Sequence, residues 1–256
     1  MANQLFNEFM NVVYSGALAS ARIAPVFYLL PFLNTGYLTG SVRIPVMILI
    51  ALSVWPFNVT DYNVIKEKVN LVSILFEVGV GFILGILLSL PFWIFQAVGA
   101  ICDNQRGSMM SSVFDPTTGT DTPELARLFN LFACVIYLQN GGMVYLVETI
   151  TKSYFICMPF EKCITDISYI YNYLNFLVKK TIMISSPVVG VLLCIEIFLG
   201  LLSRFASQLN AFSVLLSVKT FAAICIILLY FTAVSPELVM SFTSYAQYFS
   251  IITKGG

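Results

Sequence analysis

The stretch that decides the fold is Leu71–Ile101, which reads LVSILFEVGVGFILGILLSLPFWIFQAVGAI. It exceeds the about 20 apolar residues that a helix needs to span a bilayer. One ionisable residue, Glu77, and one late proline, Pro91, interrupt it. Because a charged group in hydrocarbon is costly, this pattern indicates a membrane helix whose acid faces protein or water.

Apolar stretches with similar interruptions recur along the rest of the chain. They are Val12–Leu33, Val42–Phe57, Leu125–Val147, Ile182–Leu202, Val214–Phe231 and a tail, Leu238–Ile252. Several contain arginine, lysine, glutamate or proline, which lipid-facing helices rarely carry. The sequence therefore predicts an all-α, polytopic membrane protein of one domain, residues 1–256. Its helices are expected to be broken at prolines and to pack against protein.

The composition excludes several other classes. Of the 256 residues 59% are hydrophobic and 10% are charged, whereas about 25% charged residues are usual in soluble domains. The net charge is zero, so nucleic acid is not an expected partner. The chain contains no histidine, so neither a cofactor, a metal nor catalysis is expected. No lysine or arginine precedes the first apolar stretch, so no cleaved signal peptide is expected.

The six cysteines form no CxxC pair. We expect most of them to be small buried apolar side chains. A disulfide between Cys157 and Cys163 is the alternative.

The distribution of basic residues predicts an orientation. If six stretches cross the membrane, seven lysines fall on the side of the N-terminus: Lys66, Lys68, Lys152, Lys162, Lys179, Lys180 and Lys254. Only Arg106 and Arg204 fall in loops on the other side, if Arg43 and Arg127 are not counted as loop residues. By the positive-inside rule, both termini are expected in the cytoplasm.

The segment before the fifth stretch has one apolar face. Apolar residues recur there at steps of three and four: Ile164, Ile167, Tyr171, Leu174 and Leu177. This spacing predicts a helix that lies either at a membrane interface or against neighbouring helices.

The most polar segment is Cys102–Glu124, CDNQRGSMMSSVFDPTTGTDTPE. Asp115-Pro116 favours a turn, and Gly107 and Gly119 allow flexible joints. Asp121 and Glu124 resemble a capping box with Pro123 in the first turn of a helix. We interpret the segment as a long loop that includes Gln105, Arg106, Met109, Met110 and Phe114. It is either a solvent loop or a loop that closes a pore.

The charges inside apolar stretches allow two interpretations. Glu77 is either a functional acid or the partner of a basic group, with Gly81 and Gly85 permitting close helix packing. Glu196, Arg204 and Lys219 are expected at subunit contacts, with proton transfer as the alternative. Arg22 and Arg43 are expected to pair with carboxylates of partner subunits.

Five sequence motifs, in order along the chain, resemble those of one family. They are Arg22, Pro25, Pro31 and Arg43 before Trp55-Pro56; Glu77-Val-Gly79-Val-Gly81-Phe-Ile-Leu-Gly85; Gln105-Arg106-Gly107-Ser108-Met109 with Asp115-Pro116-Thr117-Thr118-Gly119; Ser153-Tyr154-Phe155 with Pro159; and Ser203-Arg204-Phe205-Ala206-Ser207-Gln208-Leu209-Asn210-Ala211-Phe212 with Lys219. This pattern resembles the SctT/FliR family of type III secretion export-apparatus proteins. Its residues resemble the injectisome branch, of SpaR type, more than the flagellar branch.

The resemblance implies a non-enzymatic component of an inner-membrane pore for unfolded secreted proteins. It implies SctR-type and SctS-type subunits and an SctU-type switch protein as partners, in a helical assembly partly raised towards the periplasm. It also implies that the loop matching Gln105–Pro123 plugs the closed pore. A secondary transporter for a small solute is the alternative, although Leu71–Ile101 and Ile182–Leu202 show no repeated phrase.

Overall fold

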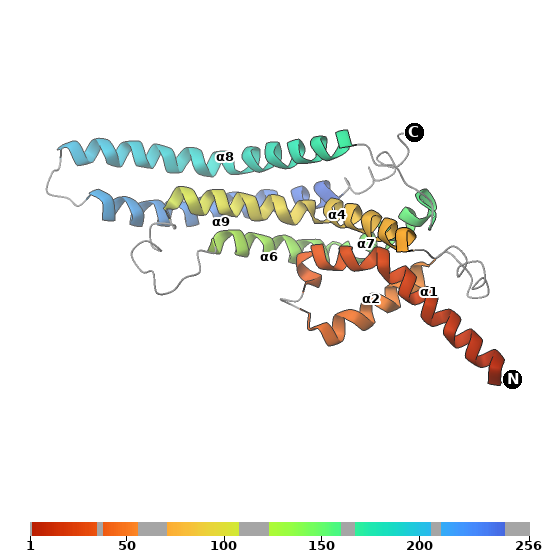
Figure 1. Cartoon of the computed structure of the whole chain (residues 1–256). Coiled ribbons are helices and arrows are strands. Elements are labelled where there is room, and N and C mark those ends of the chain that lie inside the picture. The colour runs from red at the N-terminus through yellow and green to blue at the C-terminus, as the bar shows by residue number, and fades with distance from the viewer. Residues whose placement is uncertain are drawn as a thin grey trace. The chain divides into compact units, whose positions relative to one another are not determined.

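The computed structural model describes residues 2–34, 38–55, 71–107, 123–159, 167–205 and 211–243. All regular elements within these residues are helices (Figure 1). They are α1 (Ala2–Leu29), η1 (Pro31–Leu33), α2 (Gly40–Val54), α4 (Leu71–Arg106), α6 (Glu124–Gln139), α7 (Gly142–Ile156), α8 (Ile167–Phe205) and α9 (Ala211–Thr243). The predicted all-α class is confirmed.

The chain forms two compact units. Unit 1 comprises Met1–Leu90, Tyr137–Tyr171 and Phe242–Gly256, and unit 2 comprises Pro91–Ile136 and Asn172–Ser241. The long helix α4 contributes its N-terminal part to unit 1 and its C-terminal part, from Pro91 onward, to unit 2.

Unit 1 is organised around α1, whose buried face includes Ile23, Val26 and Phe27. Two glycines of α4 allow the backbones of α1 and α4 to touch. A Cβ atom on Gly81 would overlap the carbonyl oxygen of Arg22, and one on Gly85 would lie 3.2 Å from the Cα atom of Val26. Glycines at this four-residue spacing are typical of close helix packing in membranes.

A sharp bend separates α6 from α7. The two helices meet at 79°, and Gly141 between them has a φ of 77°, a conformation that glycine adopts readily. The stretch Leu125–Val147 was expected to cross the membrane as one segment, but the structure breaks it at this glycine. The sequence Asn140-Gly141-Gly142 is a turn signal that the apolar residues on both sides obscure.

Unit 2 is built from the C-terminal part of α4 with most of α6, α8 and α9. Its core includes Phe92, Phe95, Phe129 and Leu192, all of which are fully or almost fully buried. Gly99 of α4 lies so close to Ala126 of α6 that an added Cβ atom would be 2.5 Å from the Cα atom of Ala126. The backbones of α4 and α6 are thus in contact close to the helix ends that flank the polar loop.

Within the described residues, fewer than six helices are long and apolar enough to cross a membrane. In the described part of the chain they are Leu71–Arg106 and Tyr171–Phe205, and the bent pair α6–α7 makes a third if it counts as one span. The helix α2, with 15 residues, is shorter than a typical span. The predicted orientation assumes six crossings, whereas the described helices support two or three.

Two predicted boundaries are wrong. The polar loop was expected to begin at Cys102, but α4 continues to Arg106. The sequence predicts separate elements for the apolar face at residues 164–177 and for the stretch Ile182–Leu202, but from Ile167 onward they form one helix, α8. Lys179 and Lys180 interrupt the apolar pattern without ending the helix, because both are good helix formers.

The prolines interrupt the helices less than expected. Prolines lie inside helices that continue through them: Pro25 in α1, Pro45 in α2, Pro91 in α4 and Pro187 in α8. A helix interrupted by proline persists where its neighbours satisfy the freed backbone groups. At Pro31, in contrast, the short helix η1 follows the end of α1.

The packing of α4 on α1 predicts a contrast between two glycines. Gly81→Ala should destabilise the protein by about 1–3 kcal/mol, because the new methyl group meets the backbone of Arg22. Gly79→Ala should be neutral or slightly stabilising, because nothing lies within 4 Å of a Cβ atom there. Thermal unfolding of the detergent-extracted protein measures both effects. Equal effects of the two substitutions would contradict this packing.

Candidate functional site

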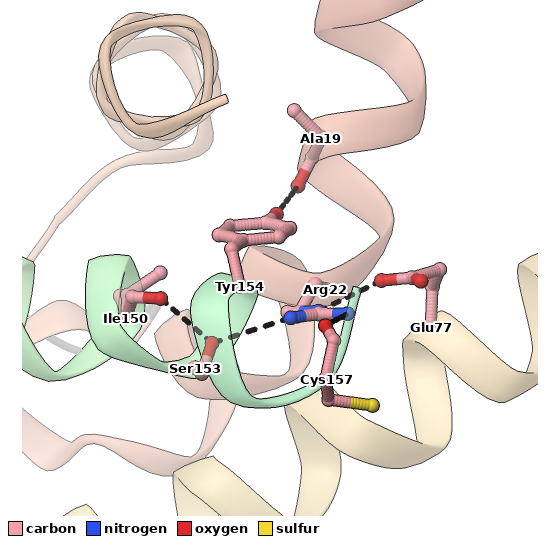
Figure 2. Close-up of polar contacts among 7 residues, drawn as sticks. All are labelled: Ala19, Arg22, Glu77, Ile150, Ser153, Tyr154 and Cys157. Atoms are coloured by element: carbon pink, nitrogen blue, oxygen red, sulfur yellow. Dashed lines mark hydrogen bonds and ion pairs between the residues drawn. The ribbon is translucent and has the colours of Figure 1, made fainter. Parts of the chain in front are cut away.

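The first polar cluster surrounds Arg22, which has no exposed surface (Figure 2). Its Nε donates a hydrogen bond to Oε2 of Glu77 on α4 over 2.7 Å. Its Nη2 donates to the carbonyl oxygen of Cys157 over 3.0 Å, and its Nη1 donates to the hydroxyl of Ser153 over 3.4 Å. The guanidinium carbon lies 4.1 Å from the ring centre of Tyr154. Three helices of unit 1 thus converge on one cation.

The side chains that contact Arg22 have hydrogen-bond partners of their own. The Ser153 hydroxyl donates to the carbonyl oxygen of Ile150 over 2.6 Å, and the Tyr154 hydroxyl donates to that of Ala19 over 3.3 Å (Figure 2). The Cys157 carbonyl lies at the C-terminal end of α7, where the helix dipole favours a cation. Because each group already has a partner, the cluster has the character of a structural joint.

The second polar cluster lies in unit 2 at the base of the polar loop. Asp103, whose side chain is fully buried, accepts a hydrogen bond from Nε of Arg106 over 2.7 Å. Its other oxygen accepts the backbone N–H of Leu125 over 2.7 Å. Asp103 therefore caps the N-terminus of α6 from a different helix, where the helix dipole favours a carboxylate.

A neighbouring ion pair holds the C-terminal end of α4. The ammonium group of Lys219 donates to Oε2 of Glu196 over 2.7 Å and to the backbone carbonyl of Gln105 over 3.4 Å. Gly107 then ends the helix with a φ of 87°, and its Cα faces Leu216 of α9. Gln105 and Leu125, on the two sides of the polar loop, are thus each held by a charged side chain.

The predicted helix start after the loop is confirmed, but its details differ. The helix α6 begins at Glu124, and the carbonyl of Pro123 accepts the N–H of Arg127, so Pro123 precedes the first turn. Asp121 was the predicted cap and lies outside the described residues. The predicted plug residues Met109, Met110, Phe114, Asp115, Pro116 and Gly119 also lie outside the described residues.

The remaining charges predicted at subunit contacts differ in their surroundings. Arg43 is 6% exposed, and its guanidinium carbon lies 4.1 Å from the ring centre of Tyr28. Arg204, by contrast, is exposed near the C-terminal end of α8. The structure thus brings together Arg22 with Glu77 and Glu196 with Lys219, and it places Arg43 and Arg204 elsewhere.

The cysteines divide into three groups. Cys102 and Cys134 are buried free thiols, as expected, whereas Cys194 is exposed and Cys225 is partly exposed. Cys157 is disulfide-bonded, which agrees with the alternative interpretation of this residue. Cys163 lies outside the described residues.

No arrangement typical of a metal site occurs in the described ranges. They contain no group of three or more histidine, cysteine, aspartate or glutamate residues that could hold a metal ion. The polar clusters are ion pairs and helix caps, whose chemistry is to fix helices in an apolar setting.

The chain matches the Bacterial export proteins, family 1, over residues 13–245. The chain belongs to this family. It is 46% identical to the surface presentation of antigens protein SpaR of Salmonella typhimurium over 236 residues, which cover 92% of this chain and 90% of that protein. It is 48% identical to SpaR of Shigella flexneri over 207 residues, 80% of each chain. Identity to the flagellar biosynthetic protein FliR of Buchnera aphidicola is 25% over 232 residues, 88% of each chain.

These matches confirm the predicted SctT/FliR family and its injectisome branch. The protein is a non-enzymatic component of the type III secretion export apparatus, and it is a membrane protein. Its buried ion pairs therefore belong to a protein that forms part of an export machine.

Sequence reasoning missed several residues of the two clusters. Asp103 lies within the predicted polar loop and received no role of its own, although it caps α6. Ser153 and Tyr154 entered only as part of a family phrase, although both contact Arg22. The sequence held a signal for Asp103 alone. Asp103 precedes Arg106 by three residues, and this spacing is typical of an ion pair on one helix.

The cap on α6 predicts different effects for two acids that approach the same arginine. Asp103→Ala should cost about 2–4 kcal/mol, because it leaves a buried N–H group and Arg106 without their acceptor. Glu124→Ala should cost less than about 1 kcal/mol, because its side chain is 89% exposed and 3.9 Å from Arg106. Thermal unfolding and protease resistance of the extracted protein measure the contrast. A larger loss with Glu124→Ala would refute the assignment of the cap.

Proposed function

We propose that this protein forms part of the inner-membrane pore for unfolded secreted proteins, and that its polar loop closes the pore at rest. The observation that supports this is the anchoring of the loop at both ends. Asp103 connects the end of α4 with the start of α6, and Lys219 holds the carbonyl of Gln105. These contacts stabilise the ends of α4 and α6, which a loop that opens and closes a pore requires.

The composition of the loop supports the same function. Its residues Met109, Met110 and Phe114 are apolar, whereas most of their neighbours are small or polar. Apolar side chains close a narrow pore by excluding water, and a polar backbone is solvated when the pore opens. Methionine side chains adapt to changing surfaces, which suits a loop that must reseal after each substrate.

We propose partners of the SctR type and SctS type, and an SctU-type switch protein, in a helical assembly that is partly raised towards the periplasm. Many apolar side chains of α8 and α9 are exposed in the single chain, such as Ile197, Phe198, Phe205, Phe221 and Leu229. A monomeric soluble protein rarely exposes so much apolar surface. Partner helices and membrane lipid would cover it.

We further propose that both termini face the cytoplasm, on the basis of the lysine distribution. The Cys157 disulfide favours the opposite side for the end of α7, because disulfides persist in the periplasm and not in the cytosol. If each candidate span crosses once, Cys157 lies on the same side as the start of α4. Labelling of reduced Cys157 by a membrane-impermeant maleimide in intact cells decides between the two sides.

Deletion of Ser108–Phe114 should leave the complex assembled but leaky. Small ions or dyes should cross the inner membrane of resting cells, and the purified complex should show higher conductance in a planar bilayer. Replacing Met109, Met110 and Phe114 together by serine should give the same leak at full loop length. Replacing Ser111 and Ser112 by alanine is the matched control and should leave the resting conductance unchanged.

The loop is not the plug if the deleted complex assembles normally and conducts no more than the intact complex. In that case the solvent-loop interpretation is correct.

A further inference from the structure

One side of α4 in unit 2 carries amide side chains, although the helix as a whole is apolar. Gln96, Ala100 and Asn104 follow one another at four-residue spacing, so they lie on the same side of the helix. We call these three residues the α4 amide row. Gln96 and Asn104 are exposed and Ala100 is partly exposed, whereas the side of α4 with Phe92 and Phe95 is buried. At the rise of an α-helix the row extends over about 12 Å.

The amides of this row use little of their hydrogen-bonding capacity within the chain. Oε1 of Gln96 accepts a hydrogen bond from Nδ2 of Asn130 on α6 over 3.1 Å. In the parts of the chain that the structure describes, no hydrogen bond involves Nε2 of Gln96 or the side chain of Asn104. Each amide NH2 group carries two donors, and unpaired donors are costly in hydrocarbon. The row therefore suits water or a hydrogen-bonding partner rather than lipid tails.

Charged side chains are open to solvent where the row reaches the polar loop. Asn104 is followed by Gln105, whose carbonyl accepts a hydrogen bond from Lys219. The carboxylate of Glu196, which pairs with Lys219, is 45% exposed, and that of Glu124 at the start of α6 is 89% exposed. Exposed carboxylates require water at this end of α4. The α4 amide row thus continues a hydrated region from the base of the polar loop along the helix.

Another exposed surface of unit 2 has the opposite chemistry. Exposed residues of α6 recur at steps of three and four residues, and they are Leu128, Leu131 and Val135. This spacing places them on one side of α6. Because all three are apolar, this side suits lipid or an apolar helix. Of the two surfaces, the α4 amide row is the one that favours water.

We propose that the α4 amide row lines a water-filled passage next to the polar loop, and that extended polypeptide in transit contacts it. The inference rests on the proposed function, because it assumes that polypeptide passes close to the loop. Asn104 lies two residues before the end of α4, from which the loop continues. Amide side chains exchange hydrogen bonds with water and with any peptide backbone, and the row carries no charge that would retain acidic or basic segments. It therefore suits substrates of varied sequence.

Cysteine labelling tests whether the row is in contact with water. Each residue of the α4 amide row is replaced singly by cysteine, and Leu128→Cys and Val135→Cys are the matched controls. The partly or fully exposed thiols Cys194 and Cys225 are first replaced by serine. Membrane vesicles containing the complex with the Ser108–Phe114 deletion are treated with a charged, water-soluble thiol reagent. We expect labelling at least tenfold faster in the row than at the controls.

The substitution Ala100→Cys keeps this test decisive. It adds a single sulfur atom and leaves the hydrogen bond between Gln96 and Asn130 in place, so it does not depend on whether the amide variants fold. Labelling at position 100 that is no faster than at the controls would overturn the proposal.

Photo-crosslinking tests the contact with polypeptide. Benzoylphenylalanine is placed at position 100 or 104 of the assembled complex, with position 131 on the apolar side of α6 as the control. Export is arrested with a secreted protein fused to a domain that does not unfold. We expect adducts with the arrested polypeptide from positions 100 and 104, at a yield at least tenfold above that from position 131. If both positions react only with another membrane subunit or with lipid, the row does not line the passage.

The outcomes separate this proposal from the proposed function. If the row cysteines react equally fast with and without Ser108–Phe114, the row lines an aqueous passage that the loop does not close, so the lining stands and the loop is not the plug. If the deletion makes the complex leaky while the row cysteines stay unreactive, the lining is wrong and the proposed function stands.

Discussion

The ion pair between Arg22 and Glu77 constrains the whole of unit 1. Both residues lie in apolar helices, so neither charge is stable there without the other. Their side chains meet at 2.7 Å because α1 and α4 touch at Gly81, where any side chain would displace the carbonyl of Arg22. The same arginine then orients the end of α7 through Ser153, Tyr154 and the carbonyl of Cys157. The glycine spacing of α4, the pairing of Arg22 with Glu77 and the position of α7 therefore depend on one another.

In unit 2, other charged side chains stabilise the ends of helices. Its helices must end on both sides of a polar loop while the surrounding residues remain apolar. Asp103 supplies the acceptor that the first turn of α6 lacks, and Lys219 supplies a donor for the last turn of α4. Free N–H and carbonyl groups at helix ends are costly when buried, so these side chains make the ends stable. A loop with fixed ends is a suitable element for opening and closing a passage in an export protein.

The sequence predicted the features that depend on local patterns. Apolar length predicted helices, Pro123 and Glu124 marked the start of α6, and the residue phrases identified the export family. The pairing of Arg22 with Glu77 was not predictable, because 55 residues separate them and many helix neighbours were compatible with the same stretches. The cap on α6 was assigned to Asp121 because capping boxes are local, whereas Asp103 reaches the helix from 22 residues away. The bend at Gly141 was readable in the sequence, but the apolar residues around it dominated the interpretation.

The central claim is that Arg22 and Glu77 stabilise unit 1 as a pair. A double-mutant cycle with Arg22→Met and Glu77→Leu, measured by thermal unfolding of the detergent-extracted protein in its complex, tests it most directly. Each single substitution leaves a buried charge unpaired and should cost about 3–5 kcal/mol, whereas the double substitution leaves none. The double variant should therefore be more stable than either single variant. A double variant whose loss of stability equals the sum of the two single losses would contradict the claim.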